Sequence, residues 1–257
     1  MTSSTVDCHY SIIGSGPPLF LTHGIGAAED AWRFMLPKLS KHITVVTYDL
    51  RGHGKSPVTH KNFTLDELVF DLERIRKKTK FEKAHFAGHS LGGMIAPAYA
   101  LKFPKHTISV GLLSTVAGRS EEDSKKVWNV IYEMEKNGIE KTLQTLTDRW
   151  FTDEFIKNNP ELVQRRLKQV VDTDPEVFLN VFKIYAKTEM LPWLKNISKP
   201  CLLLTGEHDA GCSPKHNKIM ANEIKDSKLV ILPKYKHSFL IEAPNEVAEN
   251  LIEFINE

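Results

Sequence analysis

This chain of 257 residues contains little cysteine, lacks long apolar runs and has almost balanced charge. The three cysteines, Cys8, Cys201 and Cys212, are too widely spaced for a disulfide framework or a metal motif, so we expect no metal and a reducing cytoplasmic location. Residues 1–16 lack a basic start followed by an apolar run, which argues against a signal peptide. No apolar run approaches the ~20 residues needed to span a bilayer, so we expect no membrane partner.

The charge balance excludes a second group of functions. Formal net charge is only +2, which gives no electrostatic case for a nucleic-acid partner. The basic runs at 74–78 and 164–168 lie in helix-like segments, and we interpret them as solvated helix faces. A small molecule is therefore the expected partner, and the sequence leaves a monomer and a homodimer both open.

Apolar runs rich in β-branched and aromatic residues alternate with helix-like segments. Strands are predicted at 17–24, 43–50, 83–90, 107–115, 201–209 and 227–234. Helical spacing occupies 28–40, a Thr64–Glu67 capping box opens another helix, and 245–254 forms a last one. This alternation predicts an α/β fold whose mostly parallel central sheet has helices on both faces.

The alternation stops between 119 and 195, where the sequence is helical, charged and rich in aromatics. We predict a core domain from 1–118 and 196–257, with 119–195 inserted as a helical cap over the carboxyl edge of the sheet. Aromatics such as Trp128 and Trp150 either form the cap's own small core or roof a pocket, since ligands bind outside the carboxyl ends of such strands.

A G-x-S-x-G pattern centres on Ser90, between a predicted strand and a predicted helix. This is the context of a nucleophile elbow, in which Gly88 and Gly92 remove clashes around a strained serine. The alternative, a phosphate-binding loop, lacks a Walker lysine and a G-x-G-x-x-G pattern.

A serine hydroxyl needs a base, and the base needs an orienting acid. Asp209 follows a predicted strand, and His237 lies in the loop before the last helix, which gives the order Ser–Asp–His. Glu207 is the rival acid, although it lies within the strand end. The rival bases are His85, His89 and His208, which flank Ser90 or Asp209 too closely along the chain.

Acyl transfer also needs donors for an oxyanion. We predict the backbone N–H groups of Leu91 and Ile25, the second from the loop after the first parallel strand. His23 and Gly24 shape this loop and are tentative substrate contacts, with a structural role favoured for His23. A second glycine-rich loop carries three polar residues that could pair locally and hold it in place: Asp49, Arg51 and His53.

Five segments together resemble the α/β-hydrolase superfamily in order and spacing: THGIG, DLRGHGKS, GHSLGG, GEHDAGCSP and KHSFLIEAPNEV. Within it, the cap sequence is similar to the 3-oxoadipate enol-lactonases and their esterase-like relatives, mainly in RWFT and the DP that follows. The resemblance implies a cofactor-free hydrolase of a carboxylic ester or lactone, with Ser90, Asp209 and His237 as its triad and Ile25 and Leu91 as its oxyanion donors.

The resemblance also implies an anionic substrate, for which Arg119 and Arg149 are available in the cap. The chain departs from the family pattern at Pro214, one residue late after the acid, and at Pro97, which should kink the helix behind Ser90. Cys212 in the acid loop is either a reactive thiol or a small buried filler.

Three other functions fit the same residues. C–C bond hydrolysis or perhydrolysis would use the same triad, and a small-molecule receptor would keep the fold without turnover. A serine at position 90 argues against a dehalogenase or an epoxide hydrolase, which use an aspartate nucleophile.

Overall fold

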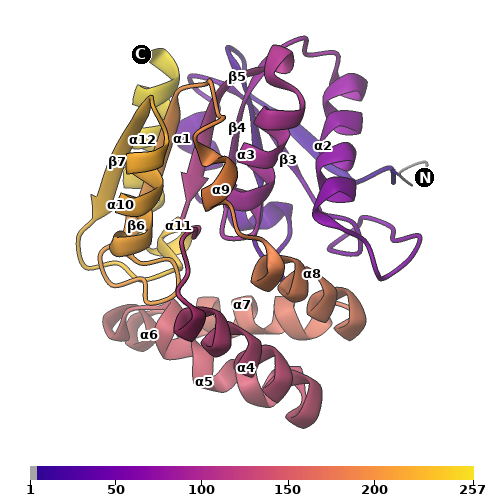
Figure 1. The fold of residues 1–257 in the computed structure, drawn as a ribbon, viewed down its shortest axis with the longest axis vertical. Coiled ribbons are helices and arrows are strands. Elements are labelled where there is room, and N and C mark those ends of the chain that lie inside the picture. Colours follow the sequence, from indigo (N-terminus) through magenta and orange to yellow (C-terminus); the bar gives the residue numbers. More distant parts are fainter. Residues whose placement is uncertain (1–4) are drawn as a thin grey trace.

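A seven-stranded sheet forms the centre of the molecule (Figure 1). The computed structural model describes residues 5–257, so the first four residues of the predicted core lie outside the described part. The strands are β1 (Tyr10–Ile13), β2 (Pro18–Thr22), β3 (Thr44–Tyr48), β4 (Ala84–His89), β5 (Thr107–Leu113), β6 (Cys201–Gly206) and β7 (Ser227–Leu232). Their order is β1-β3-β2-β4-β5-β6-β7, with β1 antiparallel to β3 and the remaining neighbours parallel. The predicted mostly parallel sheet is confirmed.

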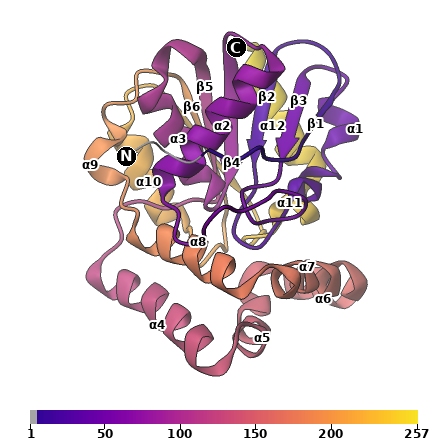
Figure 2. The same cartoon turned by 90° about the vertical axis from the view of Figure 1, so that its right-hand side faces the viewer.

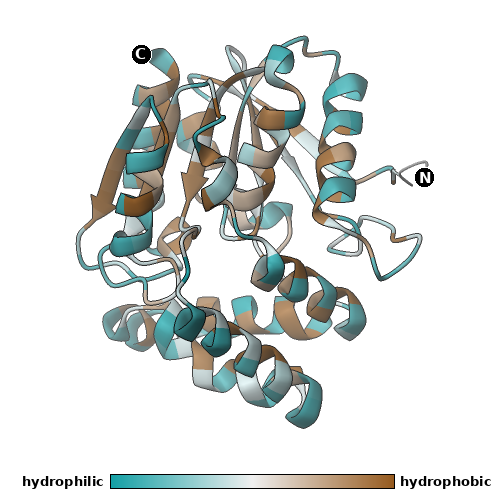
Figure 3. Ribbon diagram, viewed as in Figure 1, coloured by the Kyte–Doolittle hydropathy of each residue, from teal (hydrophilic) through white to brown (hydrophobic). Residues whose placement is uncertain are grey.

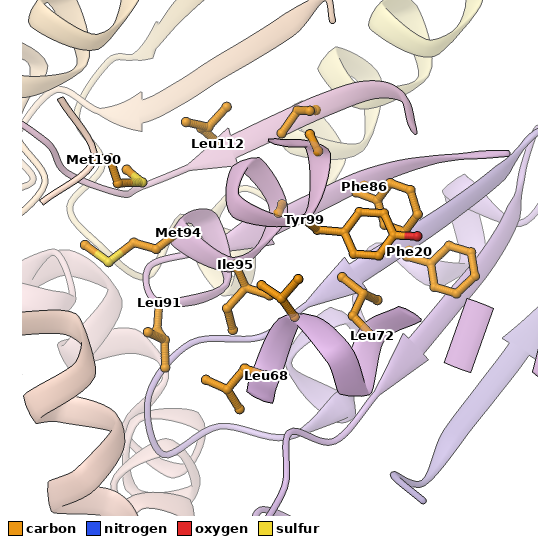
Figure 4. Close-up of a cluster of buried hydrophobic side chains, with 14 of the residues drawn as sticks. Phe20, Leu68, Leu72, Phe86, Leu91, Met94, Ile95, Tyr99, Leu112 and Met190 are labelled. Carbon is orange, nitrogen blue, oxygen red and sulfur yellow. The ribbon is translucent and has the colours of Figure 1, made fainter. Parts of the chain in front are cut away.

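Alternate side chains of the central strands enter two separate cores. In β2, Leu19 and Leu21 join the cluster under α12 (Pro244–Asn256) and α1 (Leu36–Leu39), whereas Phe20 points to the opposite face. That face is covered by α2 (Leu65–Thr79), α3 (Gly92–Lys102) and α10 (Pro214–Glu223). We call this second core the main core. Figure 4 shows part of it, where Phe20, Phe86 and Tyr99 lie together. Helices on both faces explain why these strands are apolar on both sides.

Prolines and caps set the limits of several helices. Thr64 and Glu67 form the predicted capping box at the start of α2. The predicted helix at 28–40 is divided into η1 (Glu29–Trp32) and α1, because Pro37 suits the first turn of a helix and not its interior. The helix α3 continues through Pro97, and the remaining short helices of the core are η2 (Pro104–His106) and α11 (Phe239–Glu242).

The segment after β5 forms a helical layer beyond the carboxyl edge of the sheet (Figures 1 and 2). Its helices are α4 (Glu121–Asn137), α5 (Ile139–Trp150), α6 (Asp153–Asn158), α7 (Pro160–Asp172) and α8 (Pro175–Lys187), followed by α9 (Leu191–Leu194). They carry apolar and polar stripes (Figure 3). Phe178 of α8 enters the small core of this layer, while Val177 and Val181 enter the main core. Leu194 of α9 also packs in the main core, so the layer is joined to the core along α8 and α9.

None of the helices within residues 5–257 combines the length and the apolar composition that a bilayer crossing requires.

Candidate active site

Ser90 lies on a sharp turn between β4 and α3. Its φ of 57° is in the left-handed region, which is unfavourable for a residue with a side chain, and its amide donates to the carbonyl of Leu113 at 2.9 Å. A Cβ on Gly88 would lie 2.1 Å from the carbonyl oxygen of Gly92, and one on Gly92 would lie 2.1 Å from that of Thr22. The glycines therefore allow the close backbone contacts that hold Ser90 in this strained geometry.

Asp209 follows β6 and uses both carboxylate oxygens. Oδ1 accepts the amides of Gly211 and Cys212 at 3.0 and 2.8 Å, and Oδ2 accepts from His237 Nδ1 at 2.7 Å and from the Ser114 hydroxyl. Burial alone would raise the pKa of Asp209, but the charge on His237 and these hydrogen bonds outweigh it and lower the pKa to about 2. The carboxylate is thus held ionised and in one orientation.

His237 enters the site from the loop between β7 and α11. Burial favours the neutral ring, yet the charge and hydrogen bond of Asp209 outweigh it and raise the pKa of His237 to about 10. Because Nδ1 binds the carboxylate, Nε2 on the other side of the ring remains to exchange a proton. His89 Nε2 donates to the carbonyl of His237 at 2.9 Å, and burial lowers the pKa of His89 to about 3, so a neutral ring holds this loop.

The rival acid Glu207 and the rival bases His85 and His208 form no hydrogen bond with Asp209 or His237 in the described residues. Glu207 is exposed and accepts the amide of Lys234 at 3.1 Å. His208 is also exposed, and the ring of His85 contacts Ser109 Oγ at 2.7 Å on the buried sheet. The structure brings Asp209 together with His237 and with none of these alternatives.

Two backbone amides are available next to Ser90. Within residues 5–257, neither the Leu91 nor the Ile25 amide has a hydrogen-bond partner in the chain. The Leu91 side chain is fully buried in the main core, which fixes its peptide (Figure 4). A Cβ on Gly24 would lie 3.1 Å from Ser90 Cβ, so the loop that carries Ile25 abuts the serine. Both amides therefore belong to segments that adjoin Ser90, and neither is used by the fold of the described residues.

His23 supports this loop from behind. Its Nδ1 donates to the carbonyl of Gly24 at 2.8 Å, and its Nε2 accepts the amide of Leu50 at 2.9 Å, which defines a neutral ring. Burial lowers the pKa of His23 to about 4. The ring does not line the cavity beside Ser90. His23 therefore supports the loop through its hydrogen bonds and is not a substrate contact in this structure.

The second glycine-rich loop is held partly as predicted, since His53 Nδ1 donates to the carbonyl of Arg51 at 3.1 Å within the loop. Asp49 accepts the amides of Glu29 and Lys55 at 2.7 and 2.8 Å. Arg51 instead forms two hydrogen bonds with Asp71 of α2, at 2.6 and 2.8 Å. The loop is thus tied to a helix through Arg51, because a guanidinium and a carboxylate pair well in two parallel bonds.

Ser90, Asp209 and His237 open into one cavity of about 240 Å³ between the core and the helical layer. Its walls include Gly24, Ile25, Trp150, Arg119, Arg149, Phe178, Phe182 and Tyr185. Trp128 does not reach it: the neighbouring positions Val127 and Val130 of α4 line the cavity, and the helical turn leaves Trp128 37% exposed. The structure therefore places Gly24, Trp150 and Arg119 at the cavity but not His23 or Trp128.

The cavity wall is rich in cations. Arg119 Nη2 donates to the carbonyls of Tyr185 and Thr188 at 2.8 and 2.6 Å, while its Nη1 is buried with no hydrogen-bond partner in the described part of the chain. Lys126, Arg149 and Arg166 line the same space. A buried donor without a hydrogen-bond partner costs free energy, which distinguishes Arg119 among the cations of this wall.

Arg166 is an exception to the interpretation of 164–168 as a solvated face: Gln164, Arg165 and Lys168 are exposed, whereas Arg166 is half-buried. It lies on the same face of α7 as Val163 and Val170, which are buried. Arg166 lies three residues after Val163 and four before Val170. This helical spacing would have indicated from the sequence that Arg166 shares their buried face.

Two groups of side chains within residues 5–257 offer metal-ligating atoms close together. In the first, Asp209, Cys212 and His237, the carboxylate and imidazole already bind each other, and burial raises the pKa of the Cys212 thiol. This favours Cys212 as a filler. In the second, His9, Glu29 and Asp49, the Asp49 oxygens accept backbone amides. The Asp209 carboxylate in the first group and the Asp49 carboxylate in the second therefore already have partners within the chain.

Comparison with known proteins gives consistent matches along the chain. Residues 17–244 match the family described as alpha/beta hydrolase fold. The chain is 28% identical over 242 residues to 3-oxoadipate enol-lactonase 1 of Acinetobacter baylyi, covering 94% of this chain and 89% of that protein. It is 24% identical to (E)-2-((N-methylformamido)methylene)succinate hydrolase of the same organism, over 95% of this chain and 92% of the relative. The crystal structure of the enol-lactonase from Burkholderia xenovorans LB400 superposes with a TM-score of 0.91 at 25% identity, covering 98% of this chain and 97% of that one.

Proposed function

The chain belongs to the alpha/beta hydrolase fold family, and we propose that it is a serine hydrolase cleaving a carboxylic ester or lactone through an acyl-enzyme. The observation that carries this proposal is the pairing of Asp209 with His237 in the cavity where the strained Ser90 lies beside two free amides. The enol-lactonase relatives support the reaction class.

The proposed reaction has two halves. His237 Nε2 takes the Ser90 proton as Oγ attacks the substrate carbonyl, and Asp209 stabilises the imidazolium that forms. The Ile25 and Leu91 amides donate to the oxyanion. Collapse of the intermediate releases the alcohol, or opens the ring of a lactone, with the proton returned by His237. A water molecule deprotonated by His237 then releases the acid and restores Ser90.

We further propose that the substrate bears a carboxylate. The unpartnered Arg119 Nη1 and the neighbouring cations of the cavity wall support this, since a buried guanidinium favours a charged acceptor. The relatives are named for derivatives of adipate and succinate, which are dicarboxylates. The apolar wall around Trp150 suits the carbon chain between the two ends.

The test is a matched pair of esters: the p-nitrophenyl monoester of glutaric acid and its methyl-capped diester. We expect a higher kcat/KM for the charged ester, and we expect Arg119→Met to lower that preference by about tenfold or more, since a hydrogen bond to a charged group contributes roughly 1.5–3 kcal/mol. Arg165→Met is the control, because Arg165 is exposed and pairs with Asp30 on the surface.

Equal kcat/KM values for the two esters would contradict the carboxylate preference alone. Absence of turnover on esters and lactones would contradict the hydrolase assignment itself. Adding a β-diketone, and hydrogen peroxide with a short carboxylic acid, to the same panel separates ester hydrolysis from C–C cleavage and perhydrolysis.

A further inference from the structure

One residue of the helical layer bonds directly to the loop that supplies the Ile25 amide. Arg166 of α7 donates from Nη1 to the carbonyl of Gly26 at 2.7 Å and from Nη2 to the carbonyl of Ile25 at 2.9 Å. These residues are about 140 positions apart in the chain. The contact therefore joins the helical layer to the proposed oxyanion hole.

The charge of Arg166 is not neutralised locally. Within the described part of the chain it forms no ion pair, and Asp30, the acid that acts on it at longer range, binds Arg165 at 2.9 Å and Gln169 at 2.6 Å. The guanidinium lies 5.3 Å from the centre of the Trp150 ring. Burial lowers the pKa of Arg166 to about 10, so it remains charged at neutral pH. Burying a cation without a carboxylate partner costs free energy, which indicates that Arg166 has a role other than stabilising the fold.

The loop is also pressed against α8. Gly26 has a φ of 58°, and a Cβ there would lie 2.7 Å from the ring of Phe178. With both carbonyls bound to Arg166 and Gly26 packed on Phe178, the course of the chain at 25–26 is fixed from the helical layer. The Ile25 amide has no partner in residues 5–257, and Ile25 lines the cavity.

We propose that Arg166 is a positioning residue for the oxyanion hole: it fixes the Ile25–Gly26 segment from the helical layer and adds a desolvated positive charge beside the site where the oxyanion forms. This inference rests on the proposed hydrolase function and extends it, because it makes the helical layer part of the catalytic apparatus as well as the wall of the cavity. An interaction that strengthens as the oxyanion forms raises kcat and leaves KM nearly unchanged.

The experiment compares Arg166→Met and Arg166→Lys with Arg165→Met, the adjacent exposed arginine. The substrate is p-nitrophenyl acetate, which has no carboxylate, so recognition of substrate charge does not enter. Loss of an oxyanion donor lowers kcat by about 10²-fold or more, and we expect a loss of this order for Arg166→Met with KM within about twofold. Arg166→Lys should recover part of kcat because it keeps the charge and one bond, and Arg165→Met should resemble the wild type.

A second readout separates positioning from simple folding. A boronic acid that mimics the tetrahedral intermediate should bind Arg166→Met more weakly in proportion to the loss of kcat/KM, while thermal unfolding reports stability. A wild-type kcat in Arg166→Met, or a loss confined to KM, would overturn the inference. If Arg166→Met does not fold, Arg166→Lys decides: a kcat equal to wild type overturns the inference. A wild-type enzyme without esterase activity would instead contradict the proposed function.

Discussion

Replacement of Asp209 by asparagine probes the hydrogen-bond arrangement of the acid. Oδ1 accepts two backbone amides, from Gly211 and Cys212, so this position must stay an acceptor. The amide oxygen of the new side chain will therefore occupy it, and the NH₂ group will occupy the Oδ2 position, 2.7 Å from His237 Nδ1. An NH₂ group can only donate, so Nδ1 must accept and the ring proton moves to Nε2.

The consequence for catalysis is large. With its proton on Nε2, His237 cannot accept the proton of Ser90. The same change in another serine triad lowers kcat by about 10⁴-fold, which corresponds to roughly 5 kcal/mol, and we expect a loss of that order. The assay is initial-rate hydrolysis of p-nitrophenyl acetate, with circular dichroism to confirm an unchanged fold.

The control for this variant is Glu207→Gln. Glu207 is the rival acid two residues earlier. It is exposed and accepts the amide of Lys234, whereas His237 Nδ1 bonds to Asp209. We expect Glu207→Gln to keep wild-type kcat. If Asp209→Asn kept more than a tenth of wild-type kcat, or if Glu207→Gln suffered the larger loss, the assignment of the acid would be wrong.

Three further predictions concern the pKa of His237, the Arg51–Asp71 ion pair and the glycine behind Ser90. Because His237 must be neutral to act as a base and Asp209 raises its pKa above the ordinary 6.5, kcat/KM of a neutral ester should fall as pH decreases through a midpoint above 6.5; a midpoint below it would contradict the pairing. Arg51→Met leaves Asp71 buried and unpaired, which should lower the free energy of unfolding in urea by about 3–5 kcal/mol, whereas an unchanged midpoint would refute the structural role of this pair. Gly92→Ala should reduce both stability and kcat, by roughly 1–3 kcal/mol in unfolding free energy, while Gly211→Ala, where a Cβ would meet nothing closer than 3.8 Å, should have little effect on stability.

The sequence predicts the parts of the structure that depend on local patterns. Strands β2 to β6 are largely buried on both faces, and the edge strand β7 keeps an apolar run after Ser227 and Lys228, so short hydrophobic runs reveal them. The edge strand β1 was missed because its isoleucines, Ile12 and Ile13, are 48% and 46% exposed and form no buried run. The Thr64 cap depends only on residues nearby in the chain, and it was predicted correctly.

The candidate site was predictable to the extent that chain order fixes sheet position. Asp209 and His237 follow strands whose carboxyl ends share an edge with Ser90, and the structure brings them together. The side of a helix that faces the cavity depends on packing between helices, which composition does not determine. For that reason the sequence leaves Trp128 open between the cap core and the cavity, whereas the structure exposes it. The sequence likewise places Arg166 on a solvated face, although it bonds to the Ile25 carbonyl beside the cavity.

Covalent capture of the nucleophile tests the central claim most directly. The protein is treated with a fluorophosphonate, which reacts with activated serines, and the adduct is located by mass spectrometry of the intact protein and its peptides. We expect one adduct per chain on Ser90, none in Ser90→Ala, and a much slower reaction in Asp209→Asn. An adduct on another residue such as Cys212, or esterase turnover that survives in Ser90→Ala, would contradict it.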